Sequence, residues 1–287
     1  MVRDFRARVN GVELHYVREG RPGAPPLLLV HGWPGFWFEW HGVIAPLAER
    51  FDVVVPDMRG YGLSEKPDLP AHVGYSDLVM AEDLRALLDH LGWEEVAAVG
   101  HDFGAVWLQA LARQHPERLT KLVLFDPPYG GIGLRALFPG RAREFWYILF
   151  HQMFFAEWLV GSSPAMVRRY IGHFLSHWSH KKDLWTPEEI EEYVKVYSQP
   201  GALRGGFNCY RAAARAPGRL LNPGPRIRAP TLVLWAENDS ILPAEWADNL
   251  PKFFKDVRVK RVAECGHFMM RERPEVVVEE VTKFVLG

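Results

Sequence analysis

The hexapeptide 99–104 (VGHDFG) places Asp102 between two glycines at a spacing that could present a nucleophile. An apolar run at 96–99 precedes it and a helical pattern follows, which predicts a sharp turn between a buried strand and a helix. Gly100 and Gly104 tolerate the strained backbone of such a turn, whose central side chain points outward. A carboxylate there attacks an electrophilic sp3 carbon and forms an alkyl ester that water hydrolyses. The competing interpretation is a structural turn in which Asp102 caps the helix.

A second motif can direct backbone N–H groups at the same point. The segment 31–35 (HGWPG) directly follows the apolar run 27–30. The N–H groups of Trp33 and Phe103 together would make an oxyanion hole for a tetrahedral intermediate. The side chains of both residues are also predicted to line the substrate site.

Two further segments supply a general base and an acid to orient it. A predicted strand at 231–236 leads to Asp239, and a predicted strand at 257–262 leads to His267. The order nucleophile, acid, histidine along the chain is the order of the triad in α/β-hydrolases.

Together these motifs resemble the α/β-hydrolase superfamily and, within it, the soluble epoxide hydrolases, over essentially the whole chain. The resemblance implies that Asp102 is the nucleophile, His267 the base and Asp239 the acid, with no cofactor and no metal. The rival acid is Asp126, which follows the apolar run 122–125. Some dehalogenases of this superfamily place their acid there.

Two tyrosines lie in segments that resemble the lid helices of epoxide hydrolases. Tyr147 lies in 145–152 (FWYILFHQ), and Tyr210 lies in 207–212 (FNCYRA). Opening an epoxide leaves an alkoxide, which two phenols can hydrogen-bond and protonate. The neighbouring Trp146 is predicted to contribute to substrate binding. The alternatives to Tyr147 are Tyr170, Tyr193 and Tyr197.

Other functions share the aspartate or the fold. Haloalkane dehalogenases resemble this chain but usually carry a tryptophan after the nucleophile, where this chain has Phe103. Fluoroacetate dehalogenases carry an arginine there and a His-Trp pair in the lid, where this chain has Trp146 and Tyr147. Phe103 also departs from the tryptophan common in epoxide hydrolases. A non-catalytic ligand-binding protein built on the fold is the alternative from a different class.

Composition narrows the functional class further. The 287 residues include 34 Lys and Arg against 35 Asp and Glu, a net charge of −1, which does not indicate a nucleic-acid or anionic membrane partner. Cys209 and Cys265 do not resemble a disulfide framework, and we find neither a signal peptide nor a membrane-spanning stretch. We therefore expect a cytoplasmic enzyme acting on a small-molecule epoxide. The sequence decides neither which epoxide nor whether the protein is a monomer or a homodimer.

The chain divides into an alternating strand–helix part and a helical insertion. Residues 1–126 and 228–287 are predicted to form the α/β-hydrolase core, a doubly wound and mostly parallel sheet. An Asn10-Gly11 turn predicts an opening hairpin, and the apolar spacing over 76–91 predicts a helix. By contrast, we interpret 56–64 (PDMRGYGLS) as a structural loop.

Residues 127–227 are predicted to form a helical cap, or lid, over the nucleophile. Ser163-Pro164 and Thr186-Pro187 are typical helix starts, and Thr186 with Glu189 matches a capping box. His173, His177 and His180 could share one helical face and bind zinc, but a polar lid face is the favoured interpretation.

Overall fold

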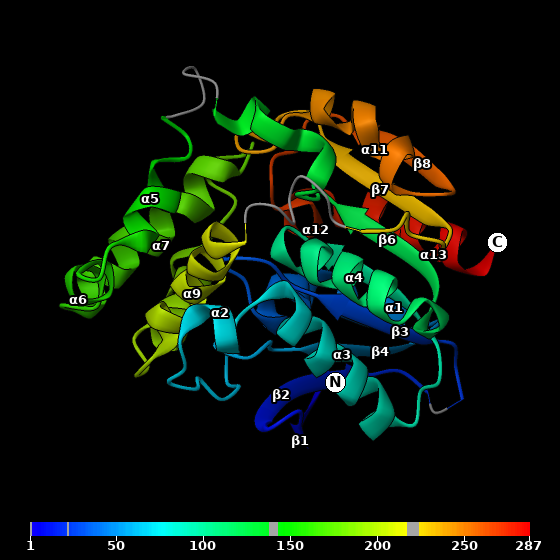
Figure 1. The fold of residues 1–287 in the computed structure, drawn as a ribbon, viewed down its shortest axis with the longest axis horizontal. Coiled ribbons are helices and arrows are strands. Elements are labelled where there is room, and N and C mark those ends of the chain that lie inside the picture. Colours follow the sequence, from blue (N-terminus) through cyan, green and yellow to red (C-terminus); the bar gives the residue numbers. More distant parts are fainter. Residues whose placement is uncertain (1, 22, 138–142, 217–223) are drawn as a thin grey trace.

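The computed structural model describes residues 2–21, 23–137, 143–216 and 224–287, which are arranged around an eight-stranded sheet (Figure 1). Its first two strands, β1 (Arg3–Val9) and β2 (Val12–Glu19), pair antiparallel, with Val9 opposite Val12. The predicted hairpin is confirmed, because Asn10 and Gly11 both have positive φ, 44° and 78°. Asn-Gly is the residue pair that such a two-residue turn favours.

The strand order is β1-β2-β4-β3-β5-β6-β7-β8, in which β2 is antiparallel to its neighbours and the other described strands pair parallel. The order confirms a doubly wound, mostly parallel sheet. The chain moves from β3 to β4 on one side and then returns to β5 on the other. The carboxyl ends of β3 and β5 therefore border the crevice where such sheets bind ligands. The remaining strands are β3 (Pro26–Val30), β4 (Asp52–Pro56), β5 (Val96–His101), β6 (Leu119–Phe125), β7 (Thr231–Ala236) and β8 (Val257–Val262).

Helices cover the sheet on both sides. The predicted helix is α3 (Asp77–Leu91), which begins after Ser76, whose Oγ accepts a hydrogen bond from the N–H of Val79. It packs against α4 (Phe103–Gln114), and α1 (His41–Ala48) packs against α13 (Pro274–Leu286). Pro243 precedes a short 3₁₀ turn, Ala244–Asn249. The short helices are α2 (Ala71–Gly74), α11 (Leu250–Phe253) and α12 (Met269–Glu272).

The insertion is helical, as predicted, and lies at one end of the sheet (Figure 1). Ser163 and Thr186 cap the starts of two of its helices, and Thr186 with Glu189 makes both hydrogen bonds of the capping box. We call the following five helices the lid helices: α5 (Trp146–Gln152), α6 (Ala156–Val160), α7 (Pro164–Trp178), α8 (Pro187–Tyr197) and α9 (Ala202–Arg215).

The loop 56–64 is structural, as its composition predicts. The buried Asp57 accepts hydrogen bonds from the N–H groups of Trp37 and Leu63, at 2.7 and 2.8 Å. Arg59, also buried, forms an ion pair with Asp83. This loop therefore fixes the backbone beside the 31–35 segment rather than contributing a reacting group.

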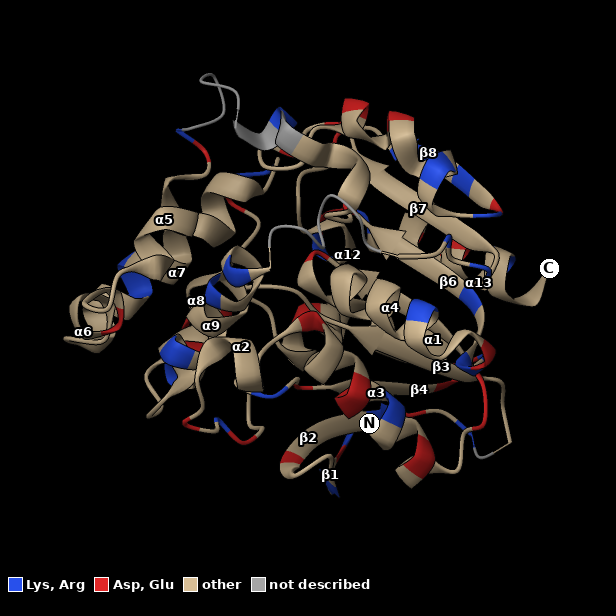
Figure 2. Cartoon of the chain, viewed as in Figure 1, with Lys and Arg blue, Asp and Glu red and all other residues tan. Residues whose placement is uncertain are grey.

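Charged residues of both signs are scattered over the elements in Figure 2, without a face of one sign in that view. Within the described ranges, we find no helix with the length and apolarity needed to cross a bilayer.

Candidate active site

The turn between β5 and α4 holds Asp102 in a strained conformation, with φ 47° and ψ −118°. A Cβ on Gly100 would lie 2.8 Å from the carbonyl carbon of Gly104, and a Cβ on Gly104 would overlap the carbonyl oxygen of Val30. Only glycine fits at either position, which explains the spacing seen in the sequence. The side chain of Asp102 makes no helix-capping hydrogen bond. The capping interpretation of this residue is therefore wrong.

Two backbone N–H groups face the Asp102 carboxylate. The N–H of Trp33 donates to its Oδ2 at 3.0 Å, and the N–H of Phe103 contributes to lowering the pKa of the carboxyl group. Burial raises the pKa of Asp102, whereas His267, His101 and these two N–H groups act in the opposite direction. The arrangement can stabilise negative charge on an oxygen of this carboxyl group, which is the requirement for an oxyanion hole.

His267 pairs with Asp239 in the interior. Its Nδ1 lies 2.8 Å from Asp239 Oδ2, and Asp239 Oδ1 accepts hydrogen bonds from the N–H groups of Ile241 and Leu242, at 2.7 and 3.0 Å. Burial lowers the pKa of His267, but Asp239 and then Asp102 raise it, to about 9. Its Nε2 has no hydrogen-bond partner among the described residues. An imidazole held in this way has one nitrogen left for water.

Asp126, the rival acid, lies in the same interior but is used differently. Its Oδ1 accepts a hydrogen bond from the N–H of Ala236 at 2.8 Å, and no hydrogen bond joins it to His267. Burial and the nearby Asp239 raise the pKa of Asp126 well above its usual range. The geometry favours Asp239 over Asp126 as the acid.

Replacing each acid by asparagine tests this assignment. We expect Asp239→Asn to lower turnover by about 10³- to 10⁴-fold, because His267 loses the anion that orients it. Asp126→Asn should have a small effect, because an amide oxygen can still accept from the N–H of Ala236. Steady-state turnover with the two variants compared at equal folded concentration provides the measurement. The opposite ranking would move the acid to the end of β6.

The two predicted tyrosines pack against each other and against Trp33 and Phe103. Tyr147 on α5 and Tyr210 on α9 are buried, and their rings meet edge to face with centroids 5.5 Å apart. Tyr147 stacks on Trp33 at 5.8 Å, and Tyr210 contacts Phe103 at 4.8 Å. Burial, with a contribution from the Asp102 charge, raises the pKa of each phenol well above its usual range. Both phenols therefore remain protonated donors at neutral pH.

Two of the three alternative tyrosines use their hydroxyl groups in other hydrogen bonds, and the third, Tyr193, has a buried hydroxyl without a partner among the described residues. The hydroxyl of Tyr170 lies 2.7 Å from His151 Nε2, and the hydroxyl of Tyr197 donates to the carbonyl oxygen of Pro34 at 2.9 Å. Tyr193 packs edge to face against Phe36 with ring centroids 5.1 Å apart. None of these contacts involves Asp102, so the geometry favours Tyr147.

The placement of Trp146 corrects one sequence prediction. Its side chain is 42% exposed and stacks on Phe174 rather than facing Asp102. Consecutive residues of an α-helix point about 100° apart, because 3.6 residues complete one turn. Since Tyr147 faces inward, its neighbour faces away from the site.

A buried hydrogen-bonded pair of side chains lies beside the base and was not predicted from the sequence. His101 Nδ1 lies 3.0 Å from Glu39 Oε1, and the rings of His101 and His267 have centroids 4.5 Å apart. A Cβ on Gly35 would overlap the Glu39 carboxylate, so the glycine leaves room for this pair. The position of His101 directly before the nucleophile was a usable signal, but nothing in the sequence singled out Glu39.

Two other residues of the lid helices, Trp178 and His151, contact the base and the tyrosines. The N–H of His267 donates to the carbonyl oxygen of Trp178 on α7 at 2.9 Å, and the two rings are 5.2 Å apart. His151 on α5 is buried, and its ring lies 4.6 Å from that of Tyr210. Burial lowers the pKa of His151 well below its usual value. The neutral imidazole is therefore a packing group between the lid helices.

Of the three histidines considered as zinc ligands, His173 and His177 stack with ring centroids 5.2 Å apart, but His180 does not share their helical face. His177 Nε2 lies 2.8 Å from Glu144, and α7 ends at Trp178, which leaves His180 outside the helix. In the described part of the chain, the group of three residues whose potential ligand atoms lie within 4.8 Å of one another consists of His101, Asp126 and the candidate base His267.

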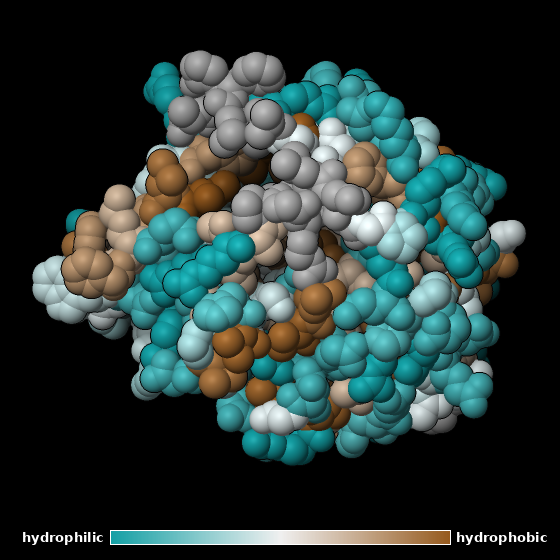
Figure 3. Space-filling view, in the orientation of Figure 1, coloured by the Kyte–Doolittle hydropathy of each residue, from teal (hydrophilic) through white to brown (hydrophobic). Residues whose placement is uncertain are grey.

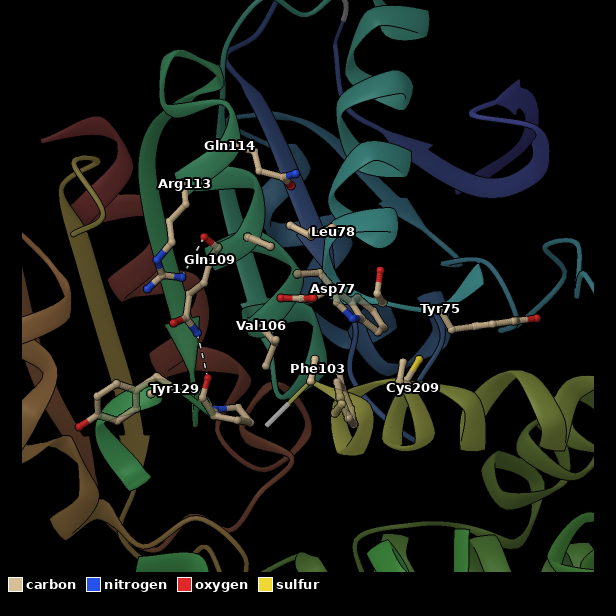
Figure 4. A pocket seen from close by; sticks show the side chains of 18 of the residues that line it. Tyr75, Asp77, Leu78, Phe103, Val106, Gln109, Arg113, Gln114, Tyr129 and Cys209 are labelled. Atoms are coloured by element: carbon tan, nitrogen blue, oxygen red, sulfur yellow. Dashed lines mark hydrogen bonds between the residues drawn. The ribbon is translucent and has the colours of Figure 1, made fainter. Parts of the chain in front are cut away.

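A cavity of about 310 Å³ adjoins the nucleophile turn (Figure 4). Phe103 and Cys209 lie at its α9 side, Val106 and Leu78 contribute apolar surface, and Tyr75 borders it. Phe103 is thus shared between this cavity and the catalytic groups. Asp102, His267, Tyr147 and Tyr210 do not line this cavity, so it lies beside the catalytic groups rather than around them.

The fold and the site define an α/β-hydrolase with an aspartate at its nucleophile turn. The family model for the alpha/beta hydrolase fold matches residues 25–158, and the model for the epoxide hydrolase N terminus matches residues 1–40. The chain belongs to the epoxide hydrolase family of this superfamily.

Individual relatives support this placement. The chain is 32% identical to a soluble epoxide hydrolase from Corynebacterium sp. (strain C12), over 97% of this chain and 96% of the relative. It is 35% identical to a fluoroacetate dehalogenase from Burkholderia sp., over 73% of this chain and 70% of the relative. The solved structure of a ligand-free epoxide hydrolase, CorEH, has a TM-score of 0.87 and 30% identity, with 99% and 98% of the two chains covered.

Proposed function

We propose that this protein hydrolyses an epoxide to a vicinal diol through a covalent ester on Asp102. The observation that carries the proposal is the pairing of two protonated phenols, Tyr147 and Tyr210, above a carboxylate nucleophile. Leaving-group protonation is a need specific to an alkoxide. The family of the chain supports the same reaction.

The first step is attack by an Asp102 carboxylate oxygen on one carbon of the oxirane. The carbon–oxygen bond on that carbon breaks as the ester bond forms, and the departing oxygen takes a proton from Tyr147 or Tyr210. The burial of both hydroxyl groups removes competing water, which strengthens their hydrogen bonds to the developing alkoxide. The product of this step is a hydroxyalkyl ester of Asp102.

The second step is hydrolysis of that ester. Nε2 of His267 takes a proton from water, and the resulting hydroxide attacks the carbonyl carbon of Asp102. The N–H of Trp33 already donates to the carboxylate, and together with the N–H of Phe103 it can hold the tetrahedral oxyanion. Ester formation removes the Asp102 charge that helps raise the pKa of His267, so a larger fraction of the imidazole is neutral and able to accept a proton. Collapse of the intermediate releases the diol and restores the Asp102 carboxylate, and the proton taken up by His267 replaces the one that the tyrosine gave up in the first step.

We also propose that the chain is divided into a core domain and a cap domain. Residues 1–126 and 228–287 would form the core domain, and 127–227 the cap domain that supplies both phenols. No cofactor or metal takes part in the scheme. We also propose a reducing, cytoplasmic location, because Cys209 and Cys265 are both buried and free.

One observation favours halide chemistry as the competing outcome. The buried indole nitrogen of Trp33 has no hydrogen-bond partner among the described residues, and an indole N–H can hold a halide ion. Against this, the position after the nucleophile is Phe103, which offers no side-chain donor.

A small substrate panel separates the two reactions. We expect diol formation from styrene oxide or a fatty epoxide and little or no halide release from 1-bromobutane or fluoroacetate. Gas chromatography for diols and a halide electrode provide the measurements. Turnover of the halides without turnover of any epoxide would overturn the proposal. Stoichiometric binding without any turnover would instead indicate a ligand-binding protein.

A further inference from the structure

We propose that the lid carries the contact surface of a homodimer, independently of the reaction assigned above. Large apolar side chains gather on the outer side of α5, on α6 and on their connection. We call the following six residues the lid patch: Trp146, Leu149, Met153, Phe154, Phe155 and Trp158.

The lid patch is unusually open to solvent. Phe154 is 92% exposed, Trp158 75% and Leu149 69%. In Figure 3, hydrophobic residues gather over the α5 side of the lid and continue toward α6. The opposite face of α5 is buried through Tyr147 and His151, so this short helix is apolar on both faces. A helix that is apolar all round is expected to be covered on both sides.

The exposed area matches what a dimer requires. With roughly 150–250 Å² for each large aromatic side chain, Phe154 and Trp158 alone expose about 300 Å² or more. The whole patch therefore exceeds the largest patch of a typical monomer, about 300–600 Å². It approaches the ~800 Å² that each partner buries in a standard stable interface.

The charges around the patch favour a second copy over a lipid surface. Residues 144–167 contain no lysine and no arginine, whereas helices that lie on membranes usually carry these residues on their polar face. Glu157, which directly precedes Trp158, forms an ion pair with Arg211. Two identical apolar patches can meet about a two-fold axis, and the charge of Glu157 is already paired within each copy.

The interface would also brace the tyrosine helices. Arg211, which follows Tyr210, donates to the carbonyl oxygens of His151 and Met153, at 2.8 and 3.2 Å. The backbone beneath the patch is thereby tied to α9 and to the helix that carries Tyr147. A partner pressing on the outer face of α5 would limit movement of both phenols.

Sedimentation of the full chain tests the proposal. Wild type should sediment at twice the 32.9 kDa of one chain. Phe154→Glu combined with Trp158→Glu should weaken association by about 100-fold or more, because each copy buries a charge in an apolar contact. Both side chains are exposed in the single chain, so far-UV circular dichroism should be unchanged. The matched control is Val259→Glu, at an exposed apolar residue of β8, which should remain dimeric.

Two results would overturn the proposal. One is a wild type that sediments as a single chain up to about 100 µM, a concentration far above the Kd of an interface of standard size. The other is a double variant that stays dimeric, since another face would then make the contact. Flotation with phosphatidylcholine vesicles accompanies the experiment. Vesicle binding by a monomeric wild type, lost in the double variant, would assign the patch to a lipid surface.

Discussion

Replacing His267 by glutamine should convert the protein into one that traps its substrate. Attack by Asp102 does not need the base, whereas hydrolysis of the ester does. Intact mass spectrometry after incubation with an epoxide should therefore show the protein plus one substrate molecule. Peptide mapping should place the adduct on Asp102. We expect steady-state turnover to fall to the background rate, because the ester persists.

A single turnover of the wild-type protein in oxygen-18 water provides the control, because it shows which atom the water attacks. Wild type in a single turnover in oxygen-18 water should carry the label in the Asp102 carboxylate, because water attacks the carbonyl carbon of the ester. Label found directly in the diol would show that His267 activates water against the epoxide itself. An unmodified His267→Gln variant, alongside an active wild type, would contradict the ester mechanism in the same way.

The second large effect concerns the lid phenols. Tyr147→Phe and Tyr210→Phe should each slow ring opening by about 10²-fold or more, in the range of general acid catalysis. The double variant should be nearly inactive, because the alkoxide then has no proton donor. Both hydroxyl groups are lost with little change in side-chain volume, so the edge-to-face contact at 5.5 Å should persist. Rapid-quench measurement of ester formation isolates the affected step.

Tyr170→Phe is the matched control for these variants. Tyr170 is a lid tyrosine whose hydroxyl bonds His151 rather than facing Asp102, so its loss should leave ester formation nearly unchanged. If wild type releases halide efficiently and the Tyr147 and Tyr210 variants are unimpaired in doing so, the epoxide assignment fails. Asp102 would remain the nucleophile in that case.

Several elements of the fold were predictable because their signals are local. The Asn10-Gly11 pair meets the backbone requirement of a tight hairpin by itself. The capping box between Thr186 and Glu189 joins residues three positions apart. The apolar runs at 27–30, 96–99 and 122–125 are strands of the parallel part of the sheet, and such runs can be recognised in the sequence because both faces of a buried strand are covered.

The contacts of the lid were harder to predict, because they depend on which way each helix faces. The sequence offered Trp146 and Tyr147 together, and only one of two adjacent helical residues can face the core. Likewise, Glu39 and His101 form a hydrogen bond although they are sixty-two positions apart in the sequence, and no local sequence pattern predicts such a pair. The exposure of Phe154 also follows from the packing of α5 and α6 rather than from its residue type.

The sequence by itself determined the nucleophile turn, the oxyanion segment, the hairpin and the chain order of Asp102, Asp239 and His267. These features follow from residue type and short-range spacing, because strained turns and helix caps accept few residues. The tertiary structure alone decided that His267 bonds Asp239 rather than Asp126, and that the rings of Tyr147 and Tyr210 pack against each other. Those outcomes depend on how strands and lid helices far apart in sequence pack together, since only packing fixes which buried side chains meet.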